Sequence, residues 1–137
     1  MRKSIWAIVF VLSFFIMGCS AHNPFIVKNT YNTATESSYS SHTNKVYLTK
    51  ETLSTKDYKY EVVSRIDVGK VWYGNSKDVY ESMAAMARKL GADAVIEVNA
   101  WYQPSGFSWA APHGSGTAIK FTGKIPTDFP GIEGKWR

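Results

Sequence analysis

Cysteine is almost absent from this sequence, in which Cys19 is the single cysteine among 137 residues. One thiol cannot form a disulfide within the chain, and it cannot build a zinc site of several thiolates. Histidine is rare as well, with three residues, and no two of them are spaced as a His-x-x-x-His pair. A metal centre made of histidines alone is therefore not expected.

Runs of basic residues are also lacking. The chain has 16 Lys and Arg against 11 Asp and Glu, and the lysines are spread along its length. Binding to nucleic acid through phosphates requires a concentrated positive field, so we expect no nucleic-acid partner. Gly114-Ser115-Gly116 lacks the Lys-Ser/Thr pair of a phosphate-binding loop, and no Gly-x-Ser-x-Gly motif is present. The sequence thus predicts no catalytic residue and no cofactor.

A long apolar run is missing except near the start, where the segment from Ile5 to Met17 follows Arg2 and Lys3. As a helix this segment would reach about 20 Å, which is short of the roughly 30 Å hydrocarbon layer of a membrane. A positive start, a short apolar run and a small residue, here Gly18, are typical of a cleaved export signal. We therefore expect residues 1–18 to be a signal peptide.

The end of this leader, Ile16-Met17-Gly18-Cys19, resembles the lipobox of bacterial lipoproteins. In that family the cysteine receives diacylglycerol, and the resemblance implies that acyl chains on Cys19 anchor the protein to a membrane. The position of the lone cysteine agrees with this role. Inner-membrane lipoproteins of enteric-type bacteria resemble one another in having an aspartate directly after the lipidated cysteine. This chain has Ser20 at that position, which favours the cell outer membrane.

Three segments are expected after the leader. Residues 19–44 are rich in Ser, Thr, Asn and Tyr and have almost no aliphatic pattern, which predicts a lipidated polar tether. Residues 45–123 carry the patterns of a folded domain. Residues 124–137 contain several Pro and Gly without a period, so an irregular C-terminal tail is expected, in which Phe129 and Trp136 could still help to close the core.

Two strands and a helix are predicted first in the domain. Residues 45–49 form a short strand candidate, and residues 58–73 form a longer one whose predicted core face comprises Tyr60, Val62, Ser64, Ile66, Val68 and Lys70. Asn75 and Asp78 resemble a capping box that begins a helix over residues 76–90. Gly91 is placed to end this helix in a left-handed conformation. The apolar residues of the helix recur at helical spacing and are Val79, Met83, Met86 and Leu90.

Two further strands are predicted over residues 94–101 and 116–121, with a loop between them. The order strand, strand, helix, strand, strand predicts an α+β fold in which a small β-sheet has one α-helix packed on one face.

The predicted loop is unusually aromatic for a connection. Tryptophan and tyrosine offer wide apolar faces with a polar group and are enriched where proteins bind partners. We consider two interpretations: the loop aromatics form a surface that binds another envelope protein, or Trp101 and Phe107 cover an open face of the same sheet. The residues concerned are Trp101, Tyr102, Phe107 and Trp109.

Two rival functions depend on His113. It could bind a metal ion together with a carboxylate such as Asp93, which would make the domain a metal-binding one. It could instead act as a base for Ser115 in a hydrolase, which is the least supported hypothesis because no nucleophile motif is present.

The stretch Leu90-Gly91-Ala92-Asp93-Ala94-Val95-Ile96, followed by Gly116-Thr117-Ala118-Ile119-Lys120-Phe121, resembles two families. One is the Rcs stress-sensor lipoproteins of bacterial envelopes, and the other is the YbjQ-type domains described as heavy-metal binders. The resemblance implies a small α+β fold and a binding or sensing role. The stress sensors are braced by disulfides, whereas this chain has no cysteine after Cys19.

Overall fold

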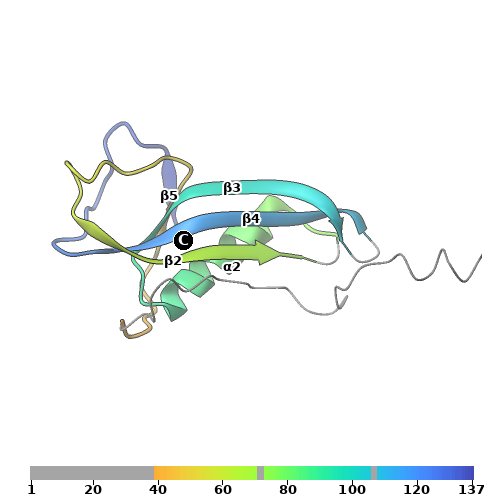
Figure 1. The fold of residues 1–137 in the computed structure, drawn as a ribbon, viewed down its shortest axis with the longest axis horizontal. Helices are drawn as coiled ribbons and strands as arrows, with labels where there is room; N and C mark the ends of the chain where they lie inside the picture. Colours follow the sequence, from red (N-terminus) through yellow and green to blue (C-terminus); the bar gives the residue numbers. More distant parts are fainter. Residues whose placement is uncertain (1–38, 71–72, 106–107) are drawn as a thin grey trace, which may run out of the picture.

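The computed structural model describes residues 39–70, 73–105 and 108–137 (Figure 1). The expected leader, the lipidated Cys19 and most of the tether lie outside the described residues. The described part contains the following elements, in chain order: β1 (Tyr47–Thr49), β2 (Tyr60–Gly69), α2 (Ser76–Lys89), β3 (Ala94–Ser105), β4 (Ser108–Phe121) and β5 (Gly134–Trp136).

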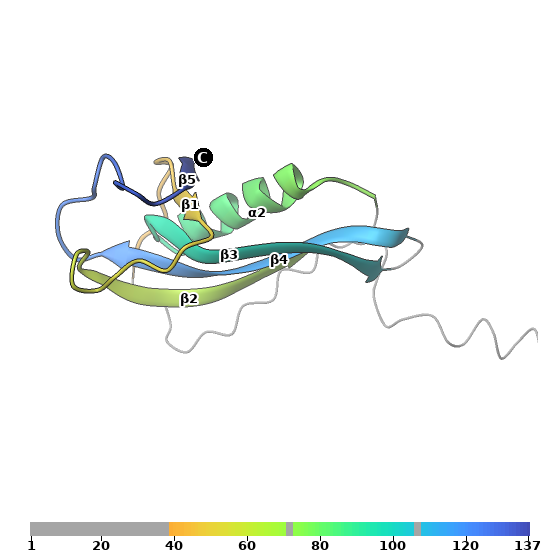
Figure 2. The same cartoon turned by 90° about the horizontal axis from the view of Figure 1, so that it is seen from above.

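The predicted α+β class is confirmed. Five strands form one sheet in the order β2-β4-β3-β1-β5, and α2 packs across one face of it (Figure 2). The central strands β2, β4 and β3 are antiparallel, β1 runs parallel to β3, and β5 pairs antiparallel with β1. None of the described helices is long and apolar enough to cross a membrane.

The helix begins and ends as its sequence predicts. Asn75 accepts a hydrogen bond from the backbone N–H of Asp78, and the Asp78 carboxylate accepts one from the backbone N–H of Asn75. Gly91, just beyond the helix, has φ of +72°, the left-handed conformation that glycine adopts without strain. Both capping predictions are confirmed.

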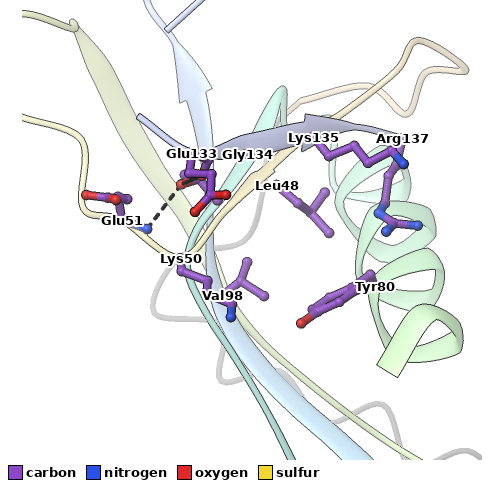
Figure 3. Close-up of a pocket in the computed structure, with 10 residues that line it drawn as sticks. Leu48, Lys50, Glu51, Tyr80, Val98, Glu133, Gly134, Lys135 and Arg137 are labelled. Atoms are coloured by element: carbon purple, nitrogen blue, oxygen red, sulfur yellow. Dashed lines mark hydrogen bonds between the residues drawn. The ribbon is translucent and has the colours of Figure 1, made fainter. Parts of the chain in front are cut away.

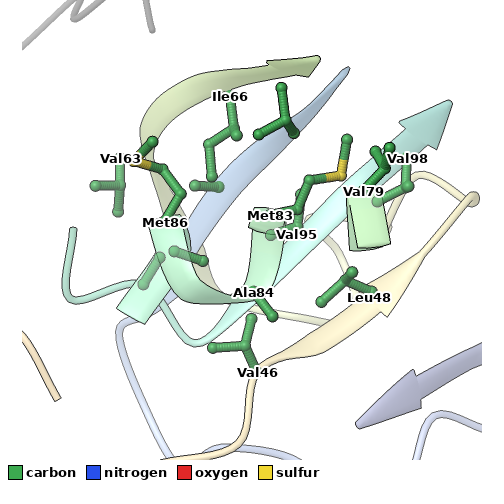
Figure 4. Close-up of a cluster of buried hydrophobic side chains, with 14 residues drawn as sticks. Val46, Leu48, Val63, Ile66, Val79, Met83, Ala84, Met86, Val95 and Val98 are labelled. Atoms are coloured by element: carbon green, nitrogen blue, oxygen red, sulfur yellow. The ribbon is translucent and has the colours of Figure 1, made fainter. Parts of the chain in front are cut away.

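The main core lies between α2 and the sheet (Figure 4). Val79, Met83 and Met86 point from the helix onto buried residues of the strands, among them Ile66 and Val95. Removing these apolar side chains from water is the main favourable contribution to folding.

A second apolar cluster covers the opposite face of the sheet near β1 and β5. Phe129 stacks on Tyr47 with ring centroids 4.0 Å apart, and it lies near Trp136 as well. Residues 134–136 pair with β1 as β5. The expectation of an irregular tail over residues 124–137 was therefore wrong for its last part, because a three-residue strand is too short to show a period.

The predicted core face of β2 was also wrong at two positions, Tyr60 and Val62, and Tyr60 packs against the second apolar cluster instead. Val62 is 60% exposed, whereas Val63 is buried beside Met86. The pairing of β2 with β4 shifts between Val62 and Ser64, which marks a β-bulge. One extra residue reverses the alternation of side chains from that point, and a strict two-residue period cannot reveal it.

The predicted tether does not stay separate from the domain over its last described residues. The backbone N–H of His42 donates to the carbonyl of Arg88 at 3.1 Å, and Nε2 of His42 lies 2.8 Å from the carbonyl oxygen of Ala92. The hydroxyl of Tyr39 donates to Glu61 at 2.7 Å. The chain from residue 39 onward thus lies against the C-terminal end of α2.

Candidate functional site

The segment that was expected to be an aromatic loop is part of a long β-hairpin. β3 continues to Ser105 and β4 begins at Ser108, and these two residues pair at the far end. The loop prediction was wrong because Gly, Ser and Pro suggested a break where cross-strand pairing continues. In Figures 1 and 2 the hairpin runs past the ends of β2 and α2.

Three of the four predicted partner-binding residues lie at this outer part of the hairpin, and we call them the aromatic end. Trp109 is 84% exposed, Tyr102 is 52% exposed and Trp101 is 36% exposed. Phe107 lies outside the described residues. The alternative, in which Trp101 and Phe107 cover an open face of the sheet, stays a prediction, since Trp101 is 36% exposed and stacks on His113 while Phe107 is not described.

Trp101 is held in place by its neighbours. Its indole N–H donates to Oε1 of Gln103 at 2.8 Å, and Nε2 of Gln103 lies 3.3 Å from Nδ1 of His113. The rings of Trp101 and His113 are stacked, with centroids 6.2 Å apart. A side chain that is already fixed loses little rotamer freedom when a partner binds it.

Tyr102 lies beside the beginning of α2. Its hydroxyl is 3.4 Å from the hydroxyl of Ser76, the first helical residue. The helix start is itself fixed, because Lys70 donates to the Asp78 carboxylate at 2.7 Å. This hydrogen bond lowers the pKa of Asp78 below its ordinary value. The aromatic end therefore rests on an ordered helix terminus.

The two candidate metal ligands are not brought together. His113 pairs with Trp101 at the outer part of the hairpin, whereas Asp93 contacts Lys120 and Phe121 near the other end of β4. Lys120 lies seven positions along β4 from His113, which corresponds to roughly 23 Å. Among the described residues no cluster of metal-binding side chains is found.

Asp93 has a structural environment instead. It is 5% exposed, its carboxylate accepts hydrogen bonds from Lys120 at 2.7 Å and from the backbone N–H of Phe121 at 3.1 Å, and its backbone carbonyl accepts from Tyr47. The buried carboxylate, whose oxygens are already satisfied, thus holds β4, and the backbone carbonyl of the same residue holds β1.

Ser115 is a poor nucleophile candidate. It is buried in the middle of β4, where it pairs with Asp67 of β2 and Asn99 of β3. Nucleophilic serines in hydrolases sit on exposed turns that open to the substrate. This placement gives the hydrolase hypothesis no support.

A pocket of about 360 Å³ that the sequence did not predict lies beside β1 and β5, on the helix side of the sheet (Figure 3). We call it the β5 pocket, and the residues used below to define it are Leu48, Tyr80, Val98, Glu133, Lys135 and Arg137. Glu133, Lys135 and Arg137 alternate along the sequence, but this alternation covers too few residues to predict a strand.

Comparison with known proteins gives this chain no family assignment: no protein-family model, no curated protein and no solved structure matches it.

Proposed function

We propose that this protein is a lipid-anchored, non-enzymatic binding module of the bacterial cell envelope, and that the aromatic end of the β3–β4 hairpin binds another envelope protein. The observation that carries the proposal is the exposure of Trp109, at 84%, together with Tyr102 and Trp101 on one ordered hairpin. Trp101 and Tyr102 are consecutive in β3 and lie on opposite faces of the hairpin. Exposed aromatic residues are enriched at binding surfaces.

The physical case depends on rigidity as well as exposure. β3 and β4 are paired at both ends of their described length, with two irregularities in register between, and Trp101 is fixed through Gln103 and His113. Large aromatic side chains on a rigid support bind with a small loss of conformational entropy. They are also the residues that most often dominate binding energies at protein interfaces.

The anchoring part of the proposal derives from the sequence. Lipidation of Cys19 would attach the protein to the outer membrane, and two or more acyl chains hold a protein stably. Residues 20–38, if fully extended, reach at most about 65 Å. Residue 39 would therefore lie within that distance of the membrane surface, and the aromatic end would lie farther out by up to the length of the domain.

Site-directed photo-crosslinking in living cells tests the binding surface. A photoreactive amino acid replaces Trp109 or Tyr102 in the full-length protein, and Val62 is the matched control, since it is an exposed apolar residue of 60% exposure on β2. We expect a discrete protein adduct from the two hairpin positions and none from Val62. Equal labelling from all three positions, or from none, would contradict the proposal.

A further inference from the structure

The β5 pocket lies apart from the aromatic end and has an apolar base with charged groups around it. Leu48 of β1 and Val98 of β3 form the base, and Tyr80 of α2 forms one wall (Figure 3). Its volume of about 360 Å³ is at the lower end of the range for small-molecule sites. Such a pocket suits a small ligand with an apolar part and a few charges.

The charges follow from the register of β5. Gly134 and Trp136 face the second apolar cluster, where a Cβ on Gly134 would meet the ring of Tyr47 at 2.4 Å. Alternation along the strand places Glu133, Lys135 and Arg137 on the pocket side, at steps of roughly 7 Å. One wall of the pocket thus changes from negative to positive along its length.

At the negative end of the pocket, the Thr49 side chain holds two backbone segments in place. The hydroxyl of Thr49 donates to the carbonyl of Glu133 at 2.6 Å and accepts the backbone N–H of Glu51 at 3.1 Å. These bonds fix the backbone of Glu133 and Glu51 at this end of the pocket, and in Figure 3 the Glu51 side chain points away from the other residues drawn. Neither carboxylate forms an ion pair within the described part of the chain.

The positive end is fixed by the helix. The guanidinium of Arg137 forms an ion pair with Glu81 and lies 5.3 Å from the ring centroid of Tyr80. Lys135 lies beside it on β5 and, like Lys50 elsewhere on the rim, has no carboxylate partner among the described residues. An ammonium and a fixed guanidinium together favour a carboxylate.

From this arrangement we infer that the β5 pocket binds a short zwitterionic peptide, with its ammonium group at Glu133 and its carboxylate at Lys135 and Arg137. The distance of roughly 7 to 13 Å from Glu133 to the two cations, by strand spacing, leaves room for a dipeptide and its hydrogen bonds. An apolar side chain of the peptide would contact Leu48 and Val98.

Isothermal titration calorimetry with alanyl-leucine and two capped forms tests the inference on the full-length protein in a non-ionic detergent, with empty micelles as the blank. We expect alanyl-leucine to bind, and both N-acetyl-alanyl-leucine and alanyl-leucinamide to bind about fivefold or more weakly, since each lacks one charge. No measurable binding of the free dipeptide would overturn the inference. Undiminished binding of the acetylated form would overturn it too, because that result describes a site for any anion.

A variant of Lys135 locates the carboxylate. Lys135→Gln should weaken binding of alanyl-leucine about fivefold and leave the weaker binding of alanyl-leucinamide unchanged, since the partner of Lys135 is already missing from the amide. Lys124→Gln, at an exposed lysine outside the pocket lining, is the matched control and should bind as the unaltered protein does. An equal loss for both peptides in Lys135→Gln would overturn the assignment of the carboxylate to that end.

Discussion

The imidazole ring of His113 lies against the backbone of Gly69, so closely that a Cβ on Gly69 would come within 2.2 Å of Nδ1 of His113. The two residues are register partners on β4 and β2. The absence of a side chain on one strand thus creates the place for the ring on the next, and that ring supports Trp101 through Gln103.

Replacing Gly69 by alanine should displace the His113 ring. We expect the Gly69→Ala variant to lose about 1–3 kcal/mol in free energy of unfolding, because a methyl group cannot fit without a shift of its neighbours. Urea unfolding measures the loss, and the NMR signals of the Trp101 indole should move with it. Gly123→Ala is the control, since a Cβ there meets nothing within 4 Å, and it should change stability by less than about 0.5 kcal/mol.

Alanine substitutions of Trp109 and Phe129 should distinguish a residue that binds a partner from a residue that stabilises the fold. Trp109 is 84% exposed, so Trp109→Ala should leave the free energy of unfolding within about 0.5 kcal/mol of the original value while removing the crosslinked adduct formed from position 102. Phe129 is 6% exposed and stacks on Tyr47, so Phe129→Ala should cost about 3–5 kcal/mol. Thermal and urea unfolding measure both. A large loss of stability in Trp109→Ala would identify this residue as part of the core.

The Asp93 carboxylate should be required for stability and not for metal binding. Asp93→Ala leaves Lys120 and the backbone N–H of Phe121 without their acceptor, which should cost about 2–4 kcal/mol in free energy of unfolding. Asp128→Ala at an exposed site is the control. Zinc, nickel or copper should not raise the melting temperature of the unaltered protein. A rise that disappears in Asp93→Ala would restore the metal-binding hypothesis.

The helix and the fold class could be predicted because their signals are local. The capping pair Asn75 and Asp78, the apolar spacing from Val79 and the left-handed Gly91 all act within a few residues of each other. The bulge beside Val62 could not be predicted in this way, since it depends on the pairing of β2 with another strand.

In the candidate site, too, local features could be predicted from the sequence and features that depend on distant segments could not. The aromatic residues could be identified from composition, but their support could not, because Gly69, Trp101 and His113 come from three different strands. The β5 pocket needs β1, β3, α2 and β5 together, and β5 is too short to be predicted from its own residues. Contacts between distant segments decide both cases.

Acid should weaken the start of α2 through Asp78. The hydrogen bond from Lys70 lowers the pKa of this carboxyl in the folded protein below its ordinary value of 3.8. The folded state therefore gains stability from Asp78 above pH 3.8, and this gain is lost as the pH falls from there through the lower folded pKa. Asp78→Asn should flatten this part of the stability profile, as measured by urea unfolding between pH 5 and about pH 2. An unchanged profile would show that the ion pair with Lys70 does not stabilise the helix start.

Substitution of Gly91 should reduce stability in two ways that can be measured separately. One is the strain of a left-handed residue, and the other is the loss of contact with the end of the predicted tether. Gly91 has φ of +72°, and a Cβ there would lie 2.6 Å from Cβ of Tyr39 and 2.7 Å from the carbonyl oxygen of Ser40. Gly91→Ala should therefore strain the backbone and push residues 39–40 away from the helix end, which breaks the hydrogen bond between Tyr39 and Glu61.

Gly131 provides the matched comparison, because its φ is +74° and a Cβ there meets nothing within 4 Å. Gly131→Ala should cost about 1 kcal/mol from backbone strain alone. Gly91→Ala should cost about 1–2 kcal/mol more and should speed amide hydrogen exchange at His42, whose N–H donates to Arg88. If the two variants lose the same stability and His42 exchanges at its original rate, residues 39–42 contribute nothing to the fold, and the tether is independent of the domain as far as residue 44.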